Sequence, residues 1–149
     1  MDNSQVFVVR ADSGIKTFAD LAGKIVAVQT ESAAQQALNS EERKELKDSF
    51  KELVVTSHYN AAFMDLESGA VDAIAMDIGV AKFQIAGRED KFVILDEVLM
   101  DEQYGVGFKL GNTELRDKVQ ATLEEMVADG TFAEISNKWF GYDVGIIGK

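Results

Sequence analysis

Two polar residues in this sequence follow short apolar runs, and their types suit the binding of opposite charges. Asp77 closes the run VDAIAMD, and Ser32 comes three residues after the run KIVAVQ. Aspartate offers a fixed negative charge, while a serine at the start of a helix, with the free N–H groups behind it, suits an anion. If the two runs are neighbouring parallel strands, their carboxyl ends meet at one edge, where open α/β sheets bind ligands. That edge fits a zwitterion such as a free α-amino acid.

Each of these residues also has a purely structural interpretation. Ser32 can simply cap the helix that follows it, and Asp77 can cap a helix that begins at Ile78. The local sequence does not decide between a cap and a ligand contact. His58 and Tyr59, at the end of another predicted strand, are interpreted as shaping a loop rather than binding a ligand.

The composition excludes several classes of function. A formal net charge of -11 opposes binding to a phosphate backbone, so no nucleic-acid partner is expected. The absence of cysteine and the single histidine remove thiolate and multi-histidine metal sites. No GxSxG, HExxH or GxxxxGKS/T motif occurs, and no apolar run reaches the ~20 residues of a membrane span. We therefore expect binding without catalysis, cofactor or metal.

The segments around these residues alternate between strand-like and helix-like patterns, which is typical of βαβ units around a parallel sheet. Strands are predicted at 4–10, 24–29, 52–57, 71–77 and 91–96. Thr17 and Asp20 form a capping-box pattern for a short helix that ends at Gly23. Asn60 and Gly69 are the predicted N-cap and stop of a later helix. The predicted fold class is α/β, with a doubly wound, mostly parallel sheet.

The pattern changes after Leu99. A strand is predicted at 103–109, followed by two helices whose apolar residues share one face. These residues, called the apolar stripe below, are Leu115, Val119, Leu123, Met126, Val127, Phe132, Ile135 and Trp139. Full burial stabilises each such side chain by roughly 1.5–3 kcal/mol, so a cover is expected. We expect a second copy of the chain to provide it in a homodimer with two-fold symmetry, through these carboxy-terminal helices.

Three stretches together resemble one known family: GIKTFADLAGKIVAVQTESAAQQAL, YNAAFMDLESGAVDAIAMDIGVAKF and YGVGFKLGNTELRDKVQATLEEMVADGTFAEISNKWFG. They are similar to the amino-acid-binding proteins of bacterial ABC importers, solute-binding family 3. The resemblance implies a periplasmic-binding-protein-like (type II) fold, in which two hinged lobes close on one amino acid. It implies a first hinge strand at 1–9, the second lobe at 10–101, and a second hinge strand with helices of the first lobe at 102–149. The amino-terminal part of the first lobe is expected to lie outside this chain.

The resemblance also implies roles for individual residues. Asp77 would hold the ligand ammonium, and Ser32 would hold the carboxylate with its hydroxyl and the amides behind it. Gln29, Thr30 and Ala33 belong to the same turn. The whole protein would deliver a free, polar amino acid to an ABC transporter permease. It would do so from an extracellular or periplasmic location, with a lipid anchor as one option.

This sequence departs from the turn of that family at two positions. Glu31 stands where glycine is usual, which constrains the backbone and puts a negative charge beside the carboxylate seat. Ala33 stands where a second Thr or Ser is common.

Other classes share parts of the pattern. A receiver domain also ends a strand with aspartate, but it needs an acidic pair after its first strand to hold Mg²⁺, and KIVAVQT has none. A ligand-sensing domain or a dehydratase-type enzyme can use the same two-lobed fold. Turnover of a candidate substrate would distinguish the enzyme from the importer component.

Overall fold

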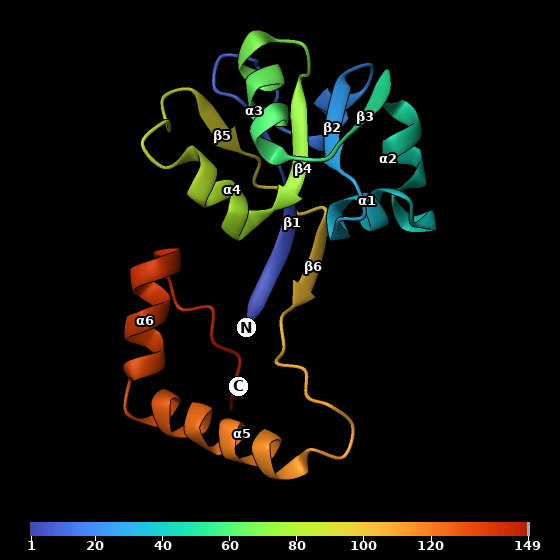
Figure 1. The fold of residues 1–149 in the computed structure, drawn as a ribbon. Coiled ribbons are helices and arrows are strands. Elements are labelled where there is room, and N and C mark those ends of the chain that lie inside the picture. The colour runs from blue at the N-terminus through green and yellow to red at the C-terminus, as the bar shows by residue number, and fades with distance from the viewer. Residues whose placement is uncertain (149) are drawn as a thin grey trace. The chain divides into compact units, whose positions relative to one another are not determined.

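The computed structural model describes residues 1–148, which form two compact units. The α/β unit comprises Ser4–Asp101, and the helical unit comprises Met1–Asn3 together with the chain from Glu102 onward. Figure 1 shows the helices and strands of each unit.

The α/β unit is built on an open sheet. Its strands are β1 (Asp2–Arg10), β2 (Ile25–Gln29), β3 (Glu52–Thr56), β4 (Ala73–Asp77) and β5 (Phe92–Ile94), in the order β3-β2-β4-β1-β5. A further strand, β6 (Met100–Gln103), pairs with β1. β2 is parallel to β3 and β4, whereas β1 is antiparallel to β4 and β5. Among these five strands only β1 runs against the others, so the predicted α/β class with a mostly parallel sheet is confirmed.

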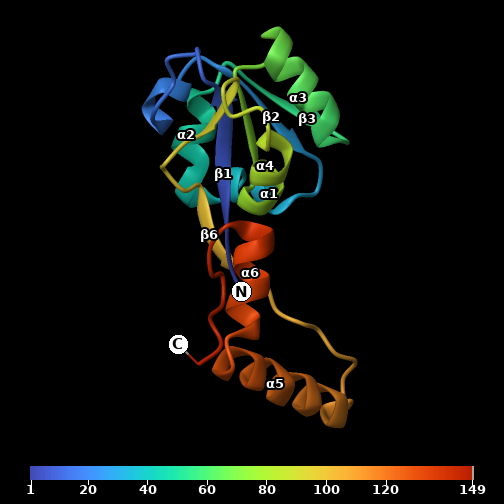
Figure 2. The same ribbon diagram turned by 90° about the vertical axis from the view of Figure 1, so that its left-hand side faces the viewer.

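Helices cover both faces of this sheet, as Figure 2 shows for α2 on one side and α3 on the other. They are α1 (Ala33–Leu38), α2 (Lys44–Ser49), α3 (Tyr59–Ser68) and α4 (Ile78–Ile85), with short 3-10 helices at Phe18–Leu21 and Glu41–Arg43. Successive strand residues point to opposite faces, so β1 sends Phe7 into a core beneath α1 and α2 and Val8 into a core with α3. Because both faces are covered, the central residues of β1, β2 and β4 are apolar on both sides.

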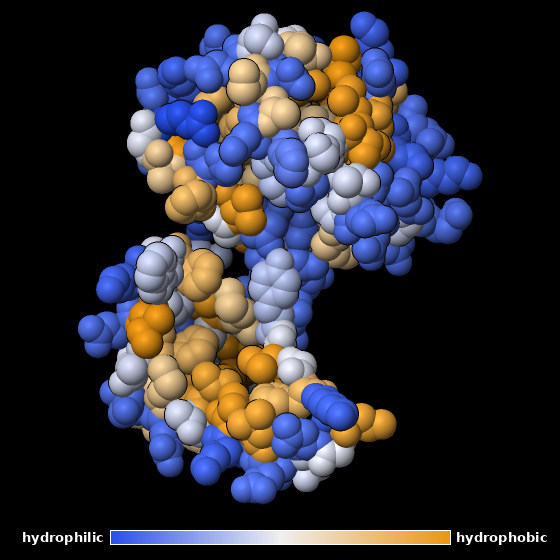
Figure 3. Space-filling model, in the orientation of Figure 1, coloured by the Kyte–Doolittle hydropathy of each residue, from blue (hydrophilic) through white to orange (hydrophobic). Residues whose placement is uncertain are grey.

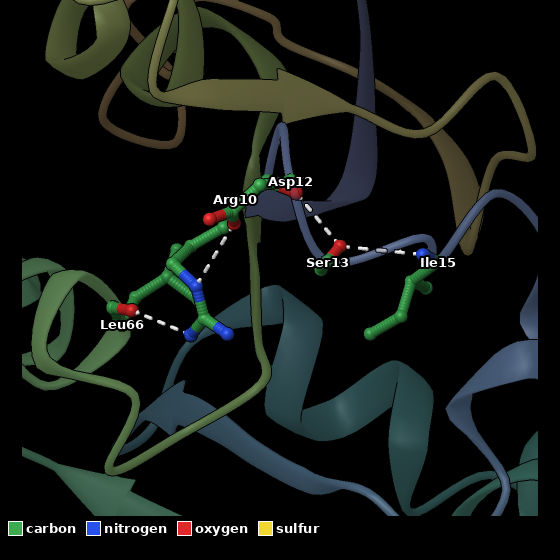
Figure 4. A network of polar contacts seen from close by, with 5 residues as sticks. All are labelled: Arg10, Asp12, Ser13, Ile15 and Leu66. Carbon is green, nitrogen blue, oxygen red and sulfur yellow. Dashed lines mark hydrogen bonds and ion pairs between the residues drawn. The ribbon is translucent and has the colours of Figure 1, made fainter.

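Arg10, at the end of β1, ties that strand to α3 (Figure 4). Its Nη1 donates a hydrogen bond of 2.9 Å to the carbonyl of Leu66, in the last turn of the helix. Ser13 Oγ donates to the Arg10 carbonyl at 2.7 Å and accepts from the Ile15 amide. A cation at a helix carboxyl end is stabilised by the helix dipole, so Arg10 fixes the α3 end that lies away from the carboxyl edge of the parallel strands.

Most local signals in the sequence act as predicted. The Asp20 carboxylate accepts hydrogen bonds of 3.0 Å from the amide and the hydroxyl of Thr17, which completes the capping box. Gly69 ends α3 with φ 82, a conformation that suits glycine. The prediction of Asn60 as the N-cap of α3 is wrong, because the helix begins at Tyr59 with His58 as its N-cap. Asn60 instead accepts a hydrogen bond from Gln84 of α4.

The helical unit contains α5 (Thr113–Ala128) and α6 (Thr131–Phe140), joined at Gly130 with φ 85. Its carboxy-terminal segment folds back on α6 through Ser136, which is 3% exposed. The Ser136 hydroxyl donates to the Tyr142 carbonyl and accepts from the Val144 amide, both at 2.8 Å. The Asp2 amide donates to the Val144 carbonyl at 2.9 Å, which holds the start of β1 in this unit.

The predicted strand at 103–109 is wrong in its bounds. Only Met100–Gln103 is a strand, and the chain from Tyr104 to Lys109 is irregular. The Tyr104 amide still donates to the Met1 carbonyl at 2.9 Å. Gly105 and Gly107 lower the strand propensity of this segment.

The apolar stripe lies on the surface of the helical unit. No residue of α5 is buried, and Leu115 and Trp139 are 48% and 74% exposed. Val119, Leu123 and Phe132 line a cavity of about 850 Å³. Figure 3 shows apolar side chains gathered over the hollowed face of this unit. Among residues 1–148, no helix combines the length and apolarity that a membrane crossing requires.

Candidate ligand-binding site

The polar residues predicted to bind a ligand lie at the carboxyl edge of the parallel strands. β2 and β4 are neighbours in parallel register, with Val28 opposite Ala75. The two strands therefore end together, β2 at Gln29 and β4 at Asp77. Ser32 begins α1 beyond the end of β2, so the structure brings Ser32 and Asp77 to one edge of the sheet.

Ser32 caps α1, as the structural interpretation predicts. Its Oγ accepts a hydrogen bond of 3.1 Å from the Gln35 amide and donates one of 2.8 Å to the Gln29 carbonyl. Ala33 is the first residue of α1 and presents an amide that the helix itself leaves without a partner.

The rest of the turn is tied to β3. The Thr30 amide donates to the Thr56 carbonyl at 2.9 Å, and the Gln29 side chain donates to the Ser57 carbonyl at 3.0 Å. Gln29 is half-buried, whereas Thr30 is exposed. The turn is therefore fixed on two strands before any ligand arrives.

The backbone conformation of Glu31 shows why glycine suits this position of the turn. Its φ of 57 makes it the one non-glycine residue with a left-handed backbone in the described chain. Non-glycine residues reach this region at a cost, typically of about 1–2 kcal/mol. The Glu31 amide donates to the Gln35 side chain at 2.7 Å, which helps to hold the conformation, and its own side chain is exposed.

Asp77 caps α4 and stays half-buried at the site. Its carboxylate accepts a hydrogen bond of 2.9 Å from the Val80 amide, so the capping interpretation is confirmed. A cap uses one lone pair, and a carboxylate has about four such positions. Capping and ligand binding are therefore compatible for Asp77.

Tyr59, which the sequence interpretation assigned to a loop, begins α3 at the same edge of the sheet. The pKa of the Tyr59 phenol is raised, mainly because the phenol is partly buried. Hydrogen bonding to the Ser32 side chain lowers this pKa, and the charge of Asp77 raises it. The electrostatic environment of the phenol therefore includes both predicted site residues. The position of Tyr59 after β3 could have predicted this placement, because Thr56 of β3 lies opposite Gln29 of β2 and the two strands end at the same edge.

Two other polar residues have structural roles. His58 is exposed, and its amide and carbonyl both contact the Thr56 hydroxyl, which shapes the loop as expected. Asp72 lies at the other end of the sheet, where it accepts a hydrogen bond of 2.9 Å from the Ile25 amide. Residues 1–148 contain no group of three metal-ligating side chains.

Comparison with known proteins identifies the family. The sequence profile of bacterial extracellular solute-binding proteins, family 3, matches residues 1–142. This chain belongs to that family. The resemblance seen in the sequence is confirmed, and the matched region includes both the α/β unit and the two helices α5 and α6.

Relatives within solute-binding family 3 are amino-acid-binding proteins by name. The ABC transporter arginine-binding protein 1 of Escherichia coli is 29% identical over 93% of this chain. The histidine-binding periplasmic protein of Salmonella typhimurium is 31% identical over 92% of it. The chain covers 56% and 54% of these two proteins, so it spans about half of their length.

Solved structures confirm the fold of this family member. A substrate-binding protein of an ABC uptake transporter from Streptococcus pneumoniae, with bound histidine, matches with a TM-score of 0.82 and 31% identity. That match covers 97% of this chain and 60% of the other. The crystal structure of Tv2483 bound to L-arginine matches with a TM-score of 0.79 and 28% identity, over 100% and 60% of the two chains. The periplasmic-binding-protein-like α/β lobe predicted from the sequence is thereby confirmed.

Proposed function

We propose that this chain supplies one side of an amino-acid site in the substrate-binding component of an ABC importer. The observation that carries the proposal is the placement of Asp77 and Ser32 at one sheet edge, where the neighbouring parallel strands β2 and β4 end. A fixed negative charge and an anion-binding turn at one edge match the two charged groups of a free amino acid. The amino-acid-binding names of the relatives support the same assignment.

In the proposed complex, Asp77 receives the α-ammonium group of the ligand. A hydrogen bond between two charged groups is roughly twice as strong as one between neutral groups. The capping bond from Val80 holds the carboxylate in place, so little side-chain entropy is lost when the ligand arrives.

The α-carboxylate lies at the turn before α1. The Ala33 amide donates to it, and the Ser32 hydroxyl exchanges the Gln29 carbonyl for this charged acceptor. Gln29 and Thr30 line the same turn and fix its position on β3. The exposed carboxylate of Glu31 repels a second negative charge, which favours ligands with a neutral or positive side chain.

This proposal assigns a non-covalent role. Neither Asp77 nor Ser32 is paired with an imidazole base, since the single histidine, His58, lies exposed in its loop. The whole protein would bind a polar amino acid between two lobes outside the cytoplasmic membrane and deliver it to a membrane permease. It would do so without catalysis.

The test is an NMR titration of the 149-residue chain with free amino acids, beginning with L-arginine and L-histidine. We expect the amide signals of Ser32, Ala33 and Asp77 to shift together, with weak affinity, because a binding site normally encloses most of its ligand and this chain offers one side. N-acetyl-L-arginine lacks the ammonium group, and L-argininamide lacks the carboxylate. Both should bind more weakly than L-arginine. Equal responses to all three compounds would refute a zwitterion site.

A further inference from the structure

Gln5 is a polar residue inside the sheet of the α/β unit. It lies in β1, is 2% exposed, and directly precedes the buried apolar run 6–9. Burial of an amide group without hydrogen bonds costs about 1–3 kcal/mol in proteins, whereas burial of an apolar side chain of similar size is favourable. For packing alone, methionine or leucine would therefore suit this position better than glutamine does.

The register of the sheet places Gln5 directly opposite Asp77, in the antiparallel ladder between β1 and β4. The Leu99 amide donates to the Gln5 carbonyl at 2.8 Å, so the backbone groups of Gln5 point away from β4. Gln5 and Asp77 are therefore a non-hydrogen-bonded pair, the kind in which facing side chains approach more closely. The Cβ atoms of residues directly opposite each other are typically about 4.5–5.5 Å apart, a distance that a glutamine side chain spans easily.

Both side chains belong to the same face of the sheet. Alternate residues of a strand share a face, so Gln5 lies on the face of Phe7 and Asp77 on the face of Ala75. Phe7 and Ala75 are part of the core beneath α1 and α2. The Gln5 amide therefore approaches Asp77 from the buried side of the sheet, beneath the helix whose first turn is the proposed site of the ligand carboxylate.

An uncharged donor is suited to a position behind a carboxylate that binds a cation. The Val80 amide uses one acceptor position of Asp77, and a carboxylate offers about four. A glutamine amide has two N–H donors, so it can hold one carboxylate oxygen and leave acceptor positions for a ligand. It does so without cancelling the negative charge, whereas a lysine or arginine in its place would compete with the ligand ammonium. Side chains held in this way by buried hydrogen bonds keep a binding geometry fixed.

We propose that Gln5 is a positioning residue for Asp77, whose side-chain amide donates a hydrogen bond to the Asp77 carboxylate and holds it toward the ligand ammonium. This inference rests on the proposed function, since it assigns a further residue to the same site. Gln5 acts through Asp77 and does not itself contact the ligand, because it is buried.

The binding experiment compares the wild-type chain with Gln5→Met, which keeps the length of the side chain and removes its N–H donors. Ser4→Ala is the matched control, because Ser4 is a buried polar residue of the same strand that points to the opposite face. Two-dimensional NMR titrations with L-arginine should show binding about three- to tenfold weaker in Gln5→Met, the effect of one hydrogen bond. Binding of N-acetyl-L-arginine, which lacks the ammonium group, should not change. Ser4→Ala should bind both compounds as the wild type does, and urea unfolding checks that each variant is folded.

The side-chain amide signals of Gln5 report the hydrogen bond directly. They are assigned as the pair of signals that Gln5→Met removes. If one N–H binds the carboxylate, Asp77→Asn should move one of the two proton signals far more than the other. Asp72→Asn should leave both in place, because Asp72 lies at the other end of the sheet, where it accepts from the Ile25 amide.

The possible results separate this inference from the proposed function. Unchanged L-arginine binding in Gln5→Met, equal losses for both compounds, or Gln5 signals that do not respond to Asp77→Asn would each refute the role of Gln5. Shifts at Asp77 and Ser32 in the wild type would still support the amino-acid site in those cases. If the wild type does not respond to L-arginine at Asp77 or Ser32, the proposed function itself fails, and the role of Gln5 fails with it. The double variant, Asp77→Asn with Gln5→Met, should bind L-arginine no more weakly than Asp77→Asn alone, because Gln5 acts through the carboxylate; additive losses would contradict the proposal.

Discussion

Asp77 caps α4 and is proposed to bind an ammonium group, and a pair of substitutions can distinguish these two roles. Asp77→Asn removes the charge but keeps a side-chain oxygen that can accept from the Val80 amide at 2.9 Å. Asparagine and aspartate are comparable N-caps, whereas alanine caps poorly. Asp77→Ala therefore removes both the charge and the cap, and Asp77→Asn removes only the charge.

The expected magnitudes differ for the two measurements. Loss of an N-cap costs about 0.5–2 kcal/mol of stability, so Asp77→Ala should lower the free energy of unfolding by roughly 1 kcal/mol and Asp77→Asn by a few tenths. For ligand binding, an exposed charge pair contributes about 0.2–1 kcal/mol, and removing one partner of a buried pair costs about 2–5 kcal/mol. Asp77 is half-buried, so we expect a loss of about 1–2 kcal/mol for both variants. Since about 1.4 kcal/mol corresponds to tenfold, this is roughly 5- to 30-fold in the dissociation constant.

Urea unfolding measures the stability of the wild type and both variants, and NMR titration with L-arginine measures binding. We expect Asp77→Asn to be close to the wild type in stability and close to Asp77→Ala in affinity. If Asp77→Asn binds L-arginine as tightly as the wild type, the carboxylate is only a cap and the ammonium assignment is wrong. If Asp77→Asn loses as much stability as Asp77→Ala, the cap and the charge cannot be separated in this way and the reasoning from the Val80 bond fails.

Three further outcomes are expected. Ser136→Ala should lower the stability of the helical unit by about 1–3 kcal/mol, because the part-buried Tyr142 carbonyl and the buried Val144 amide lose their hydrogen bonds to the Ser136 hydroxyl. Hydrogen exchange in α6 would report the loss, and unchanged protection there would contradict it. The exposed apolar stripe should make the chain a dimer by light scattering, and Leu123→Glu should make it monomeric; a strictly monomeric wild type would refute the dimer. Hydrogen bonds from the Lys16 and Thr17 backbone and the Thr17 side chain lower the pKa of Asp20 from its ordinary value of 3.8. Ionised Asp20 therefore stabilises the fold above pH 3.8, and this stabilisation is lost as the pH falls through the lower pKa of the folded state. Asp20→Asn should make the free energy of unfolding, measured with urea, fall less steeply at acid pH. The same fall in both proteins would contradict this prediction.

The positions of most elements could be predicted from local sequence. Strands β1 to β5 lie within two residues of the predicted bounds, because apolar β-branched runs between turn residues have few alternatives. Caps such as that of Thr17 and Asp20 depend on groups three residues apart, so the sequence contains all that they need. Two of the local predictions were wrong. The segment after Gln103 contains Gly105 and Gly107 and is irregular rather than a strand, and Asn60 lies inside α3 because the helix begins one residue earlier, at Tyr59.

The site shows the same division at the level of single residues. The placement of Asp77 and Ser32 at one edge could be predicted from sequence, because Asp77 ends one apolar run and Ser32 follows another by three residues. The direction of their hydrogen bonds, the left-handed backbone of Glu31 and the placement of Tyr59 at the same edge were decided by the tertiary structure. Tyr59 is 27 residues from Ser32 and 18 from Asp77 in sequence. It lies at the same edge as both, because β3 is parallel to β2 and β2 is parallel to β4. The loops that follow these three strands therefore lie at one edge of the sheet. The order of strands in a sheet depends on non-local pairing, and no local pattern in the sequence specifies it.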